Sequence, residues 1–405
     1  MQTLDQSSIK ASRRSSTVEY AIRDLVVVAK KVGKDVIYLN IGDPVKFGFD
    51  TPQHIKDALI NSVKEGKNYY GDSEGLPELR EAIAARENRK GGSVIRSDDV
   101  IVTSGVSEGV SFLMGSLVNE GDEILLPGPS YQPYISYTKF YGGVPVEYKT
   151  VEEMGWEPDV EDLKRKIGAK TRAILLINPN NPTGGICNEK SIKEIISIAS
   201  DRNLPIVVDE IYDELTYEGD FRGILSLARN DDVPIIGLNG FSKSSLMTGW
   251  RLGYVYFKDT KNGGLEEVRN AVAKLCRIRL CPNTPVQYAG LAALTGDRSF
   301  VGPVREELRR RRDYGHGRVN KIKGLSCVKP KGAFYLFPKI LGLDGKTDMQ
   351  FVLDFLKEKA VLVVPGSGFG AQYGSGHFRM VFLPPIPLLE NALDKLESFM
   401  ERRGS

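Results

Sequence analysis

The sequence has little histidine: His54, His316 and His377 are the only three in a chain of 405 residues. They lie far apart, which argues against a histidine-rich metal site and leaves few candidates for a catalytic histidine. If the protein catalyses proton transfer, we therefore expect another residue type to carry the protons.

Cysteine, long apolar runs and excess charge are scarce as well. The four cysteines form no C-x-x-C pair, so we expect no zinc or other metal site, no disulfide scaffold and a reducing compartment. The longest apolar runs, such as RAILLI, are far shorter than the ~18 residues of a membrane span, and no signal-type stretch follows the polar N-terminus. A net charge of +3 is too small to indicate nucleic-acid binding. We expect a cytoplasmic protein without a membrane or nucleic-acid partner.

Short runs of valine, isoleucine and leucine alternate with helical patterns in the middle of the chain. Such runs are typical of strands buried on both faces of a mostly parallel sheet. Each run ends in polar residues and glycine, and ligands of open α/β sheets bind beyond the carboxyl ends of the strands. Successive landmarks lie about 30 residues apart, the length of one βαβ unit. The pattern predicts one crevice that receives Ser104–Ser107, Tyr131, Asn181, Asp209 and Lys243.

The two ends of the chain differ from this pattern. Near the N-terminus, SSTVEYAIRDLVVVAKK predicts a helix with a capping box of Ser16 and Glu19 and an apolar stripe within Val18–Ala29. Tyr20 and Arg23 lie off that stripe. After about residue 285, strings such as GAFYLFP and FRMVFL predict an α+β domain. We interpret its arginine-rich stretch, REELRRRR, as a solvated helix face.

Side chains of the predicted crevice form a chemically coherent set. Lys243 is either a surface lysine at a strand end or, near apolar walls, a nucleophile with a lowered pKa. Arg251 can hold a phosphate by a two-pronged contact. Asp209 is either a helix N-cap or the partner of a ring nitrogen that must stay protonated, and Tyr212 can offer a phenol to the same ligand. With the free amides at a helix start after TSG and the amide of Asn181, this set fits pyridoxal phosphate.

A family resemblance covers most of the chain. GFSKSSLMTGWRLG resembles the pyridoxal-phosphate attachment motif of class I/II aminotransferases, and NPNNPTG, DEIY and HFR resemble the family's other landmarks in the same order. Strings such as LNIGDPVKF and PKGAFYLFPKI look most like archaeal alanine aminotransferases. One position departs from the commoner pattern: Gly240 stands where many relatives carry a phosphate-binding serine, and we expect Ser242 to compensate.

The resemblance implies a fold and a domain division. It implies fold type I of the pyridoxal-phosphate enzymes, in which a mostly parallel, seven-stranded-type sheet is sandwiched by helices in a large α/β domain beside a smaller α+β domain. We place the large, cofactor-binding domain at residues 49–285 and the small domain at 286–405. We expect the segment 1–48 to join the small domain.

The resemblance also implies a role for each site residue. Lys243 would bind the cofactor covalently and then carry the proton, Asp209 would pair with the ring nitrogen, and Tyr212 and Asn181 would contact the phenolic oxygen. The other implied contacts are Tyr131 on the ring, the amides of Val106 and Ser107 with Ser242 and Arg251 at the phosphate, Tyr70 at the phosphate of a neighbouring subunit, and Arg379 with the Gly42 backbone at the substrate carboxylate. The shared phosphate site implies a homodimer.

The substrate follows less directly from the resemblance. We expect an alanine:2-oxoglutarate aminotransferase with a ping-pong mechanism, in which Tyr20 and Arg23 sense the substrate side chain. The alternative is an aspartate, aromatic or broad-range aminotransferase, or a β-lyase, of the same family. Aspartate-preferring relatives often bring a second arginine from the partner subunit, and Arg277 and Arg279 lie near that region.

Overall fold

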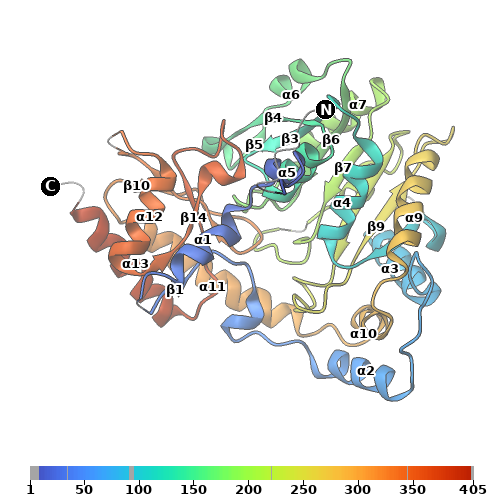
Figure 1. The fold of residues 1–405 in the computed structure, drawn as a ribbon, viewed down its shortest axis with the longest axis horizontal. Coiled ribbons are helices and arrows are strands. Elements are labelled where there is room, and N and C mark those ends of the chain that lie inside the picture. Colours follow the sequence, from blue (N-terminus) through green and yellow to red (C-terminus); the bar gives the residue numbers. More distant parts are fainter. Residues whose placement is uncertain (1–8, 34, 91–94, 220, 344, 403–405) are drawn as a thin grey trace, which may run out of the picture.

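The computed structural model describes residues 9–33, 35–90, 95–219, 221–343 and 345–402. In this part of the chain, eight strands form the largest sheet, in the order β2-β9-β8-β7-β6-β3-β4-β5 (Figure 1). Strands β4, β3, β6, β7 and β8 run parallel, whereas β9 is antiparallel to both of its neighbours. The strands are β2 (Val100–Thr103), β3 (Glu123–Gly128), β4 (Val144–Val151), β5 (Glu157–Pro158), β6 (Thr171–Ile177), β7 (Ile206–Asp209), β8 (Ile235–Gly240) and β9 (Gly253–Lys258).

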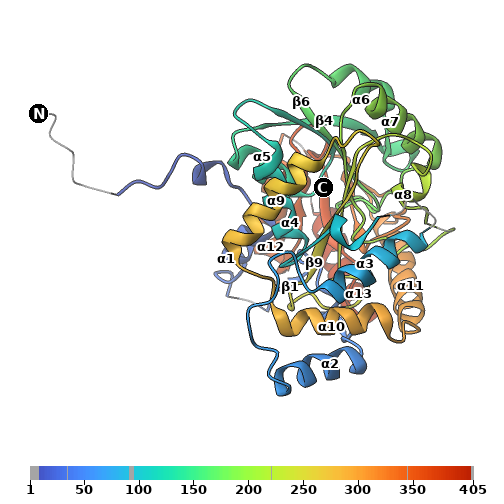
Figure 2. The same ribbon diagram turned by 90° about the vertical axis from the view of Figure 1, so that its right-hand side faces the viewer.

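Helices cover both faces of this sheet (Figure 2). Along β6, Ala173 and Leu175 pack into one apolar cluster and Ile174 and Leu176 into another, as expected for a strand buried on both sides. One face is covered by α4 (Val106–Leu117), α5 (Gln132–Phe140) and α9 (Glu266–Arg279), the other by α3 (Pro77–Arg89), α7 (Glu189–Asp201) and α10 (Thr284–Thr295). The predicted α/β fold class is confirmed. The sheet has eight strands because the two-residue β5 pairs with the end of β4.

Smaller sheets lie beside the large one, and one of them includes a strand from the N-terminal segment. Strand β1 (Ile37–Tyr38) pairs in parallel with β13 (Val361–Leu362), so a segment from the first tenth of the chain joins the C-terminal region. Strand β15 (Phe378–Val381) lies between β11 (Tyr335–Leu336) and β14 (Val364–Pro365), and β10 (Leu325–Ser326) pairs with β12 (Lys339–Ile340). We propose that the large domain ends and the small domain begins at residue 285, and that the residues up to 48 belong with the small domain.

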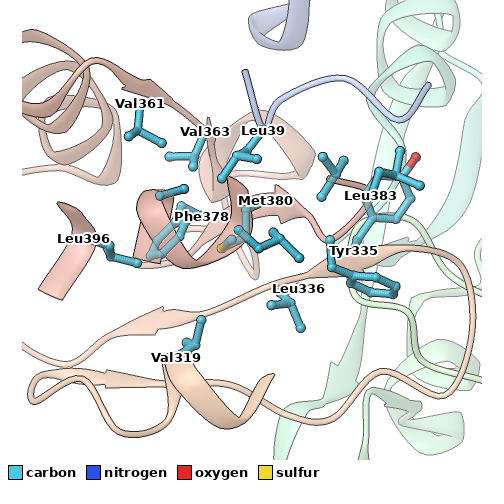
Figure 3. Close-up of a cluster of buried hydrophobic side chains, with 14 of the residues drawn as sticks. Leu39, Val319, Tyr335, Leu336, Val361, Val363, Phe378, Met380, Leu383 and Leu396 are labelled. Atoms are coloured by element: carbon cyan, nitrogen blue, oxygen red, sulfur yellow. The ribbon is translucent and has the colours of Figure 1, made fainter. Parts of the chain in front are cut away.

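A large apolar cluster forms most of the interior of this C-terminal region. It contains Leu39 from the N-terminal segment together with Leu336, Phe378 and Met380 from the small sheet (Figure 3). The helices that contribute to it are α1 (Ala21–Ala29), α11 (Val301–Val319), α12 (Asp348–Lys359) and α13 (Ile386–Glu401). The remaining helices are α2 (Gln53–Lys64), which packs on α10, and the short α6 (Val160–Lys166) and α8 (Ile224–Leu227). Over all described residues, no helix combines the length and apolarity needed to cross a membrane.

The predicted start of the N-terminal helix is wrong. Helix α1 begins at Ala21 with Tyr20 as its N-cap residue, and the carboxylate of Asp24 in the first turn accepts from the backbone N–H of Tyr20 at 3.1 Å. The backbone of Glu19 instead accepts a hydrogen bond of 2.8 Å from Ser136 on α5, which draws the preceding segment away from the helix axis. Val18 is accordingly 49% exposed rather than part of the buried stripe.

The interpretation of the arginine-rich helix holds for only part of α11. Arg309 and Arg310 are solvated and pair with glutamates one turn away. Arg311 and Arg312 are buried, contrary to the prediction. The guanidinium of Arg312 lies 4.8 Å from the ring centre of Tyr217 and donates to the Pro330 carbonyl at 3.0 Å, because tertiary contacts supply partners that the helix alone does not.

A buried charge cluster anchors the segment that follows β7. Arg86 on α3 donates to Asp213 at 2.9 Å and to Glu214 at 3.2 Å, and the amide of Asn239 on β8 donates to Asp213 at 2.9 Å. Burial alone would raise the pKa of Asp213, but the cations Arg86 and Lys90 hold it well below its usual range. The segment 209–214 is therefore held from two directions.

Candidate active site

A cavity of about 490 Å³ lies where the large sheet meets the smaller sheets. Its size falls in the range of sites for cofactors and small substrates. Of the residues that the sequence predicts for the site, Ser104, Gly105 and Tyr70 do not line this cavity. The predicted residues that line it are Tyr20, Arg23, Gly42, Val106, Ser107, Tyr131, Asn181, Asp209, Tyr212, Ser242, Lys243, Arg251 and Arg379. The topology brings them together because most of them follow the carboxyl ends of strands in one sheet.

Lys243 stands in the centre of the cavity wall. Its ammonium donates to the carbonyl of Gly42 at 2.8 Å and lies 5.2 Å from the ring centre of Phe334. Burial lowers its pKa to about 8; the carboxylate of Asp43 opposes this shift and the cation of Arg251 adds to it. An amine with such a pKa is available as a nucleophile and as a proton carrier near neutral pH.

Asp209 is the last residue of β7, and its carboxylate faces the cavity. It accepts hydrogen bonds from the Tyr134 hydroxyl at 2.8 Å and from the backbone N–H of Ile211 at 3.1 Å. Burial raises its pKa to about 6, although both hydrogen bonds favour the charged form. Within the described residues no helix begins at Asp209, so the N-cap interpretation is wrong. The carboxylate is placed to pair with a cationic group of a ligand.

The start of α4 and Arg251 form an anion-binding corner. The first amides of a helix, here those of Val106 and Ser107, have no acceptor within the helix and attract anions. Gly105, at φ +79°, precedes them, and a Cβ there would lie 2.4 Å from the guanidinium of Arg251. Arg251 donates to the Thr248 carbonyl at 3.1 Å, and the described residues offer it no carboxylate partner. The corner can therefore receive a phosphate.

The departure at Gly240 has a steric reason. Gly240 is the last residue of β8 and pairs with Gly253 of β9. A Cβ at position 240 would lie 3.0 Å from the Cα of Gly253 and 3.0 Å from the Leu252 carbonyl oxygen. A serine would press against this backbone, so the hydroxyl at the cavity comes from Ser242 instead.

Arg379 on β15 reaches the cavity from the opposite side. Only 1% of this residue is exposed. It donates to the side-chain oxygen of Asn181 at 2.8 Å and to the Asn40 carbonyl at 2.6 Å, and its guanidinium stacks 4.4 Å from the ring centre of Tyr335. Its Nε is buried without a partner among the described groups. A buried cation with an unused donor fits a carboxylate ligand.

Phenol side chains complete the cavity wall. The hydroxyls of Tyr212 and Tyr335 lie 2.6 Å apart, and those of Tyr131 and Tyr20 lie 3.3 Å apart. Burial raises the pKa of Tyr131 and Tyr212 well above the usual value, so both phenols are neutral at physiological pH. Arg23 is exposed and lies on the cavity rim on α1, one turn beyond Tyr20.

Three further residues contribute to this site although the sequence did not indicate them. Tyr134 follows Tyr131 by three residues on α5, a spacing that could have indicated a shared helix face. Asn40 and Tyr335 carry no comparable signal, because their contacts to Arg379 depend on how the N-terminal segment and strand β11 pack. Tyr70 lies outside the cavity and is 81% exposed, so its assigned contact to a neighbouring subunit stays a prediction.

Comparisons with known proteins agree with this geometry. The profile of the family "Aminotransferase class I and II" matches residues 34–396. An alanine aminotransferase structure from Pyrococcus furiosus is 54% identical, covers 97% of this chain and 100% of its own, and has a TM-score of 0.94. The glutamate-pyruvate aminotransferase AlaA of Haemophilus influenzae is 37% identical over 91% of both chains. A probable aspartate/prephenate aminotransferase of Aquifex aeolicus is 39% identical over 91% of this chain and 92% of its own.

The lowered pKa of Lys243 is testable without any ligand. We expect cyanate to carbamoylate Lys243 half-maximally near pH 8, because burial disfavours its charged form. In protein unfolded in urea, the same peptide should require a pH near the usual lysine pKa of about 10.4. Mass spectrometry of the peptide that contains Lys243 measures both profiles. Identical profiles in the folded and the unfolded protein would contradict the assignment.

Proposed function

Because this chain belongs to the class I and II aminotransferase family, we propose that it transfers the amino group between L-alanine and 2-oxoglutarate, with pyridoxal 5′-phosphate as its cofactor. Aminotransferases of this family depend on that cofactor. The products are pyruvate and L-glutamate, formed in two half-reactions in the cytoplasm. The observation that carries the proposal is the meeting of Lys243, Asp209 and Arg379 in one cavity beside a phosphate-binding corner.

The residues present fit the cofactor. Pyridoxal phosphate would supply a carbonyl carbon that takes up the amino group and a ring that withdraws electrons from the substrate carbon. Lys243 would hold that carbon covalently and then move the substrate proton, a task that suits a pKa of about 8. Asp209 would hold a proton on the ring nitrogen, and the neutral phenol of Tyr212 with the amide of Asn181 would donate to the phenolic oxygen.

The phosphate and ring have separate supports. The amides of Val106 and Ser107, the hydroxyl of Ser242 and the guanidinium of Arg251 would hold the phosphate, and the missing side chain at Gly105 lets that guanidinium approach the start of α4. Tyr131 would lie against the ring. Because these residues would hold the phosphate and one side of the ring, the side of the ring that faces Lys243 would stay free for the substrate.

The substrate side of the cavity lies between Arg379 and the N-terminal segment. Arg379 would bind the substrate carboxylate through its guanidinium, with the backbone of Gly42 beside it. Tyr20 and Arg23 on the N-terminal segment would contact the side chain. Arg23, at the rim, can close over the second carboxylate of glutamate or 2-oxoglutarate and stay away from alanine.

The arginines that would indicate an aspartate-type enzyme are engaged elsewhere. Arg279 donates to Glu108 at 2.6 Å and to the Ser73 carbonyl at 2.8 Å. Arg277 lies 3.7 Å from Glu74. The 54% identity with the alanine aminotransferase of Pyrococcus furiosus, against 39% for the aspartate/prephenate relative, also favours alanine. An aspartate, aromatic or broad-range enzyme remains the alternative.

A half-reaction panel tests the proposal. On purified protein loaded with pyridoxal phosphate, we expect alanine and glutamate to convert the cofactor to its amino form at least about tenfold faster than aspartate or phenylalanine. Stopped-flow absorbance measures each rate. Lys243→Ala should lower the rates by a factor of about 10² or more, because the proton carrier is gone. Equal or faster conversion by aspartate would replace the alanine assignment, and a Lys243→Ala protein of near wild-type rate would refute the mechanism.

The role of Arg23 predicts a selective effect on acidic substrates. In Arg23→Gln we expect the KM for glutamate and for 2-oxoglutarate to rise about tenfold or more, since a charge-assisted contact is lost. The KM for alanine should change by less than about twofold. Lys31→Gln, an exposed change on the same segment outside the cavity, is the matched control. Steady-state kinetics that show equal effects on alanine and glutamate would refute this role.

A homodimer would complete the phosphate site. Four apolar or aromatic side chains from two short stretches of the chain are exposed: Tyr69 and Tyr70 from one, Ile278 and Leu280 from the other. We infer that a second copy covers them and that the Tyr70 hydroxyl reaches the partner's phosphate corner. Tyr69 differs from Tyr70 because its hydroxyl already contacts Tyr288 at 3.2 Å.

The dimer proposal predicts different effects of neighbouring tyrosines. Tyr70→Phe should weaken pyridoxal phosphate binding about tenfold or more, because one hydrogen bond to a charged group is lost. Tyr69→Phe is the control and should leave the Kd nearly unchanged. Equilibrium titration measures the Kd, and sedimentation should give twice the mass of one chain. A monomer, or equal effects of both variants, would contradict the proposal.

A further inference from the structure

Tyr335 connects the two ends of the cavity. It lies on β11, which pairs with the strand β15 that carries Arg379, and it is buried. Its hydroxyl is 2.6 Å from that of Tyr212, which follows β7 of the large sheet. Its ring lies under the guanidinium of Arg379 at 4.4 Å. One side chain therefore contacts both the carboxylate-binding arginine and the phenol next to Lys243.

The residues around the Tyr335 hydroxyl fit closely against it. A Cβ on Gly42 would lie 2.5 Å from the Tyr335 hydroxyl oxygen, so a side chain at position 42 would displace it. The rings of Tyr335 and Tyr212 meet edge to face, with centres 5.8 Å apart and planes at 85°. Tyr335 also forms part of the apolar cluster of the C-terminal region (Figure 3). Its orientation is thus determined by packing on several sides.

We propose that Tyr335 is a positioning residue that couples substrate binding at Arg379 to the hydrogen-bonding strength of Tyr212. This inference rests on the proposed function, because it assigns Tyr212 to the phenolic oxygen of pyridoxal phosphate. Either hydroxyl of this pair can donate to the other. When Tyr212 donates to the cofactor, the Tyr335 hydroxyl would donate to the Tyr212 oxygen and so make Tyr212 a stronger donor. The ring of Tyr335 at the same time supports the plane of Arg379.

The charge of Arg379 reaches both phenols. Burial raises the pKa of Tyr335 and of Tyr212, and the positive charge of Arg379 pulls both back down. A substrate carboxylate on Arg379 cancels this charge, so both phenols become weaker acids and weaker donors. Binding of a carboxylate at Arg379 thereby weakens the hydrogen bond from Tyr212 to the cofactor, through a pair of hydroxyls 2.6 Å apart.

The test uses Tyr335→Phe, which removes the hydroxyl and keeps the ring. In the protein loaded with pyridoxal phosphate, the absorbance of the bound cofactor is followed from pH 5 to pH 10. A weaker Tyr212 donor stabilises the deprotonated cofactor less, so the spectroscopic pKa should rise by roughly 0.5–1 unit, the effect of one neutral hydrogen bond. Propionate, a carboxylate without an amino group, should shift this pKa upward in the wild type and less in Tyr335→Phe.

Two further variants separate the hydroxyl from the ring and from stability. Tyr335→Leu, which also removes the stack under Arg379, should raise the Kd of propionate at least about twofold, whereas Tyr335→Phe should not. Tyr148→Phe is the matched control, because Tyr148 is buried outside the cavity and donates to the Leu175 carbonyl at 2.9 Å. It should leave both the spectroscopic pKa and the Kd of propionate unchanged.

The failures are distinguishable. A wild type that binds no pyridoxal phosphate overturns the proposed function and this inference together. A wild type whose cofactor titrates, while Tyr335→Phe titrates at the same pH, overturns this inference alone. An equal shift in Tyr148→Phe also overturns it, because the effect would then come from any buried hydroxyl.

Discussion

The burial of Arg379 is the constraint on which the rest of the site depends. A guanidinium with 1% of its surface exposed needs partners, because an uncompensated buried charge costs several kcal/mol. Its partners come from three parts of the chain: Asn40 from the N-terminal segment, Asn181 after β6 and Tyr335 on β11. Satisfying one cation therefore brings the small sheet, the large sheet and the N-terminal segment together, and Arg379 then lines the cavity from the side of the small sheet.

Within the cavity, burial shifts an acid and a base toward neutrality from opposite sides. The pKa of Asp209 rises to about 6 and that of Lys243 falls to about 8, so both can exchange protons near pH 7 at little cost. Asp213, only four residues beyond Asp209, is also buried, yet Arg86 and Lys90 hold its pKa well below the usual range. The environment of each carboxylate thus decides its role: Asp209 can take part in proton exchange, whereas Asp213 only anchors the segment.

The errors of the sequence interpretation share a cause. The capping box at Ser16 and Glu19 has the right spacing, but a hydrogen bond from Ser136 on another helix holds the Glu19 backbone elsewhere. Arg312 looks like a surface arginine until Tyr217 and the Pro330 carbonyl are placed against it. Local patterns describe what a segment prefers in isolation, and distant contacts override preferences worth about 1 kcal/mol.

The α/β class, the family and most of the cavity lining can be predicted from the amino-acid order, because buried strands with polar ends and the string GFSKSSLMTGWRLG are local properties of the chain. The tertiary structure alone decided the contacts that connect these residues: Tyr134 on Asp209, Asn40 on Arg379, and Tyr335 between Arg379 and Tyr212. Tyr134 and Asp209 are 75 positions apart in the chain, Tyr335 and Tyr212 are 123 apart, and Asn40 and Arg379 are 339 apart. No periodicity or spacing encodes such pairs, since strand pairing and side-chain packing bring them within hydrogen-bond distance only when the chain is folded.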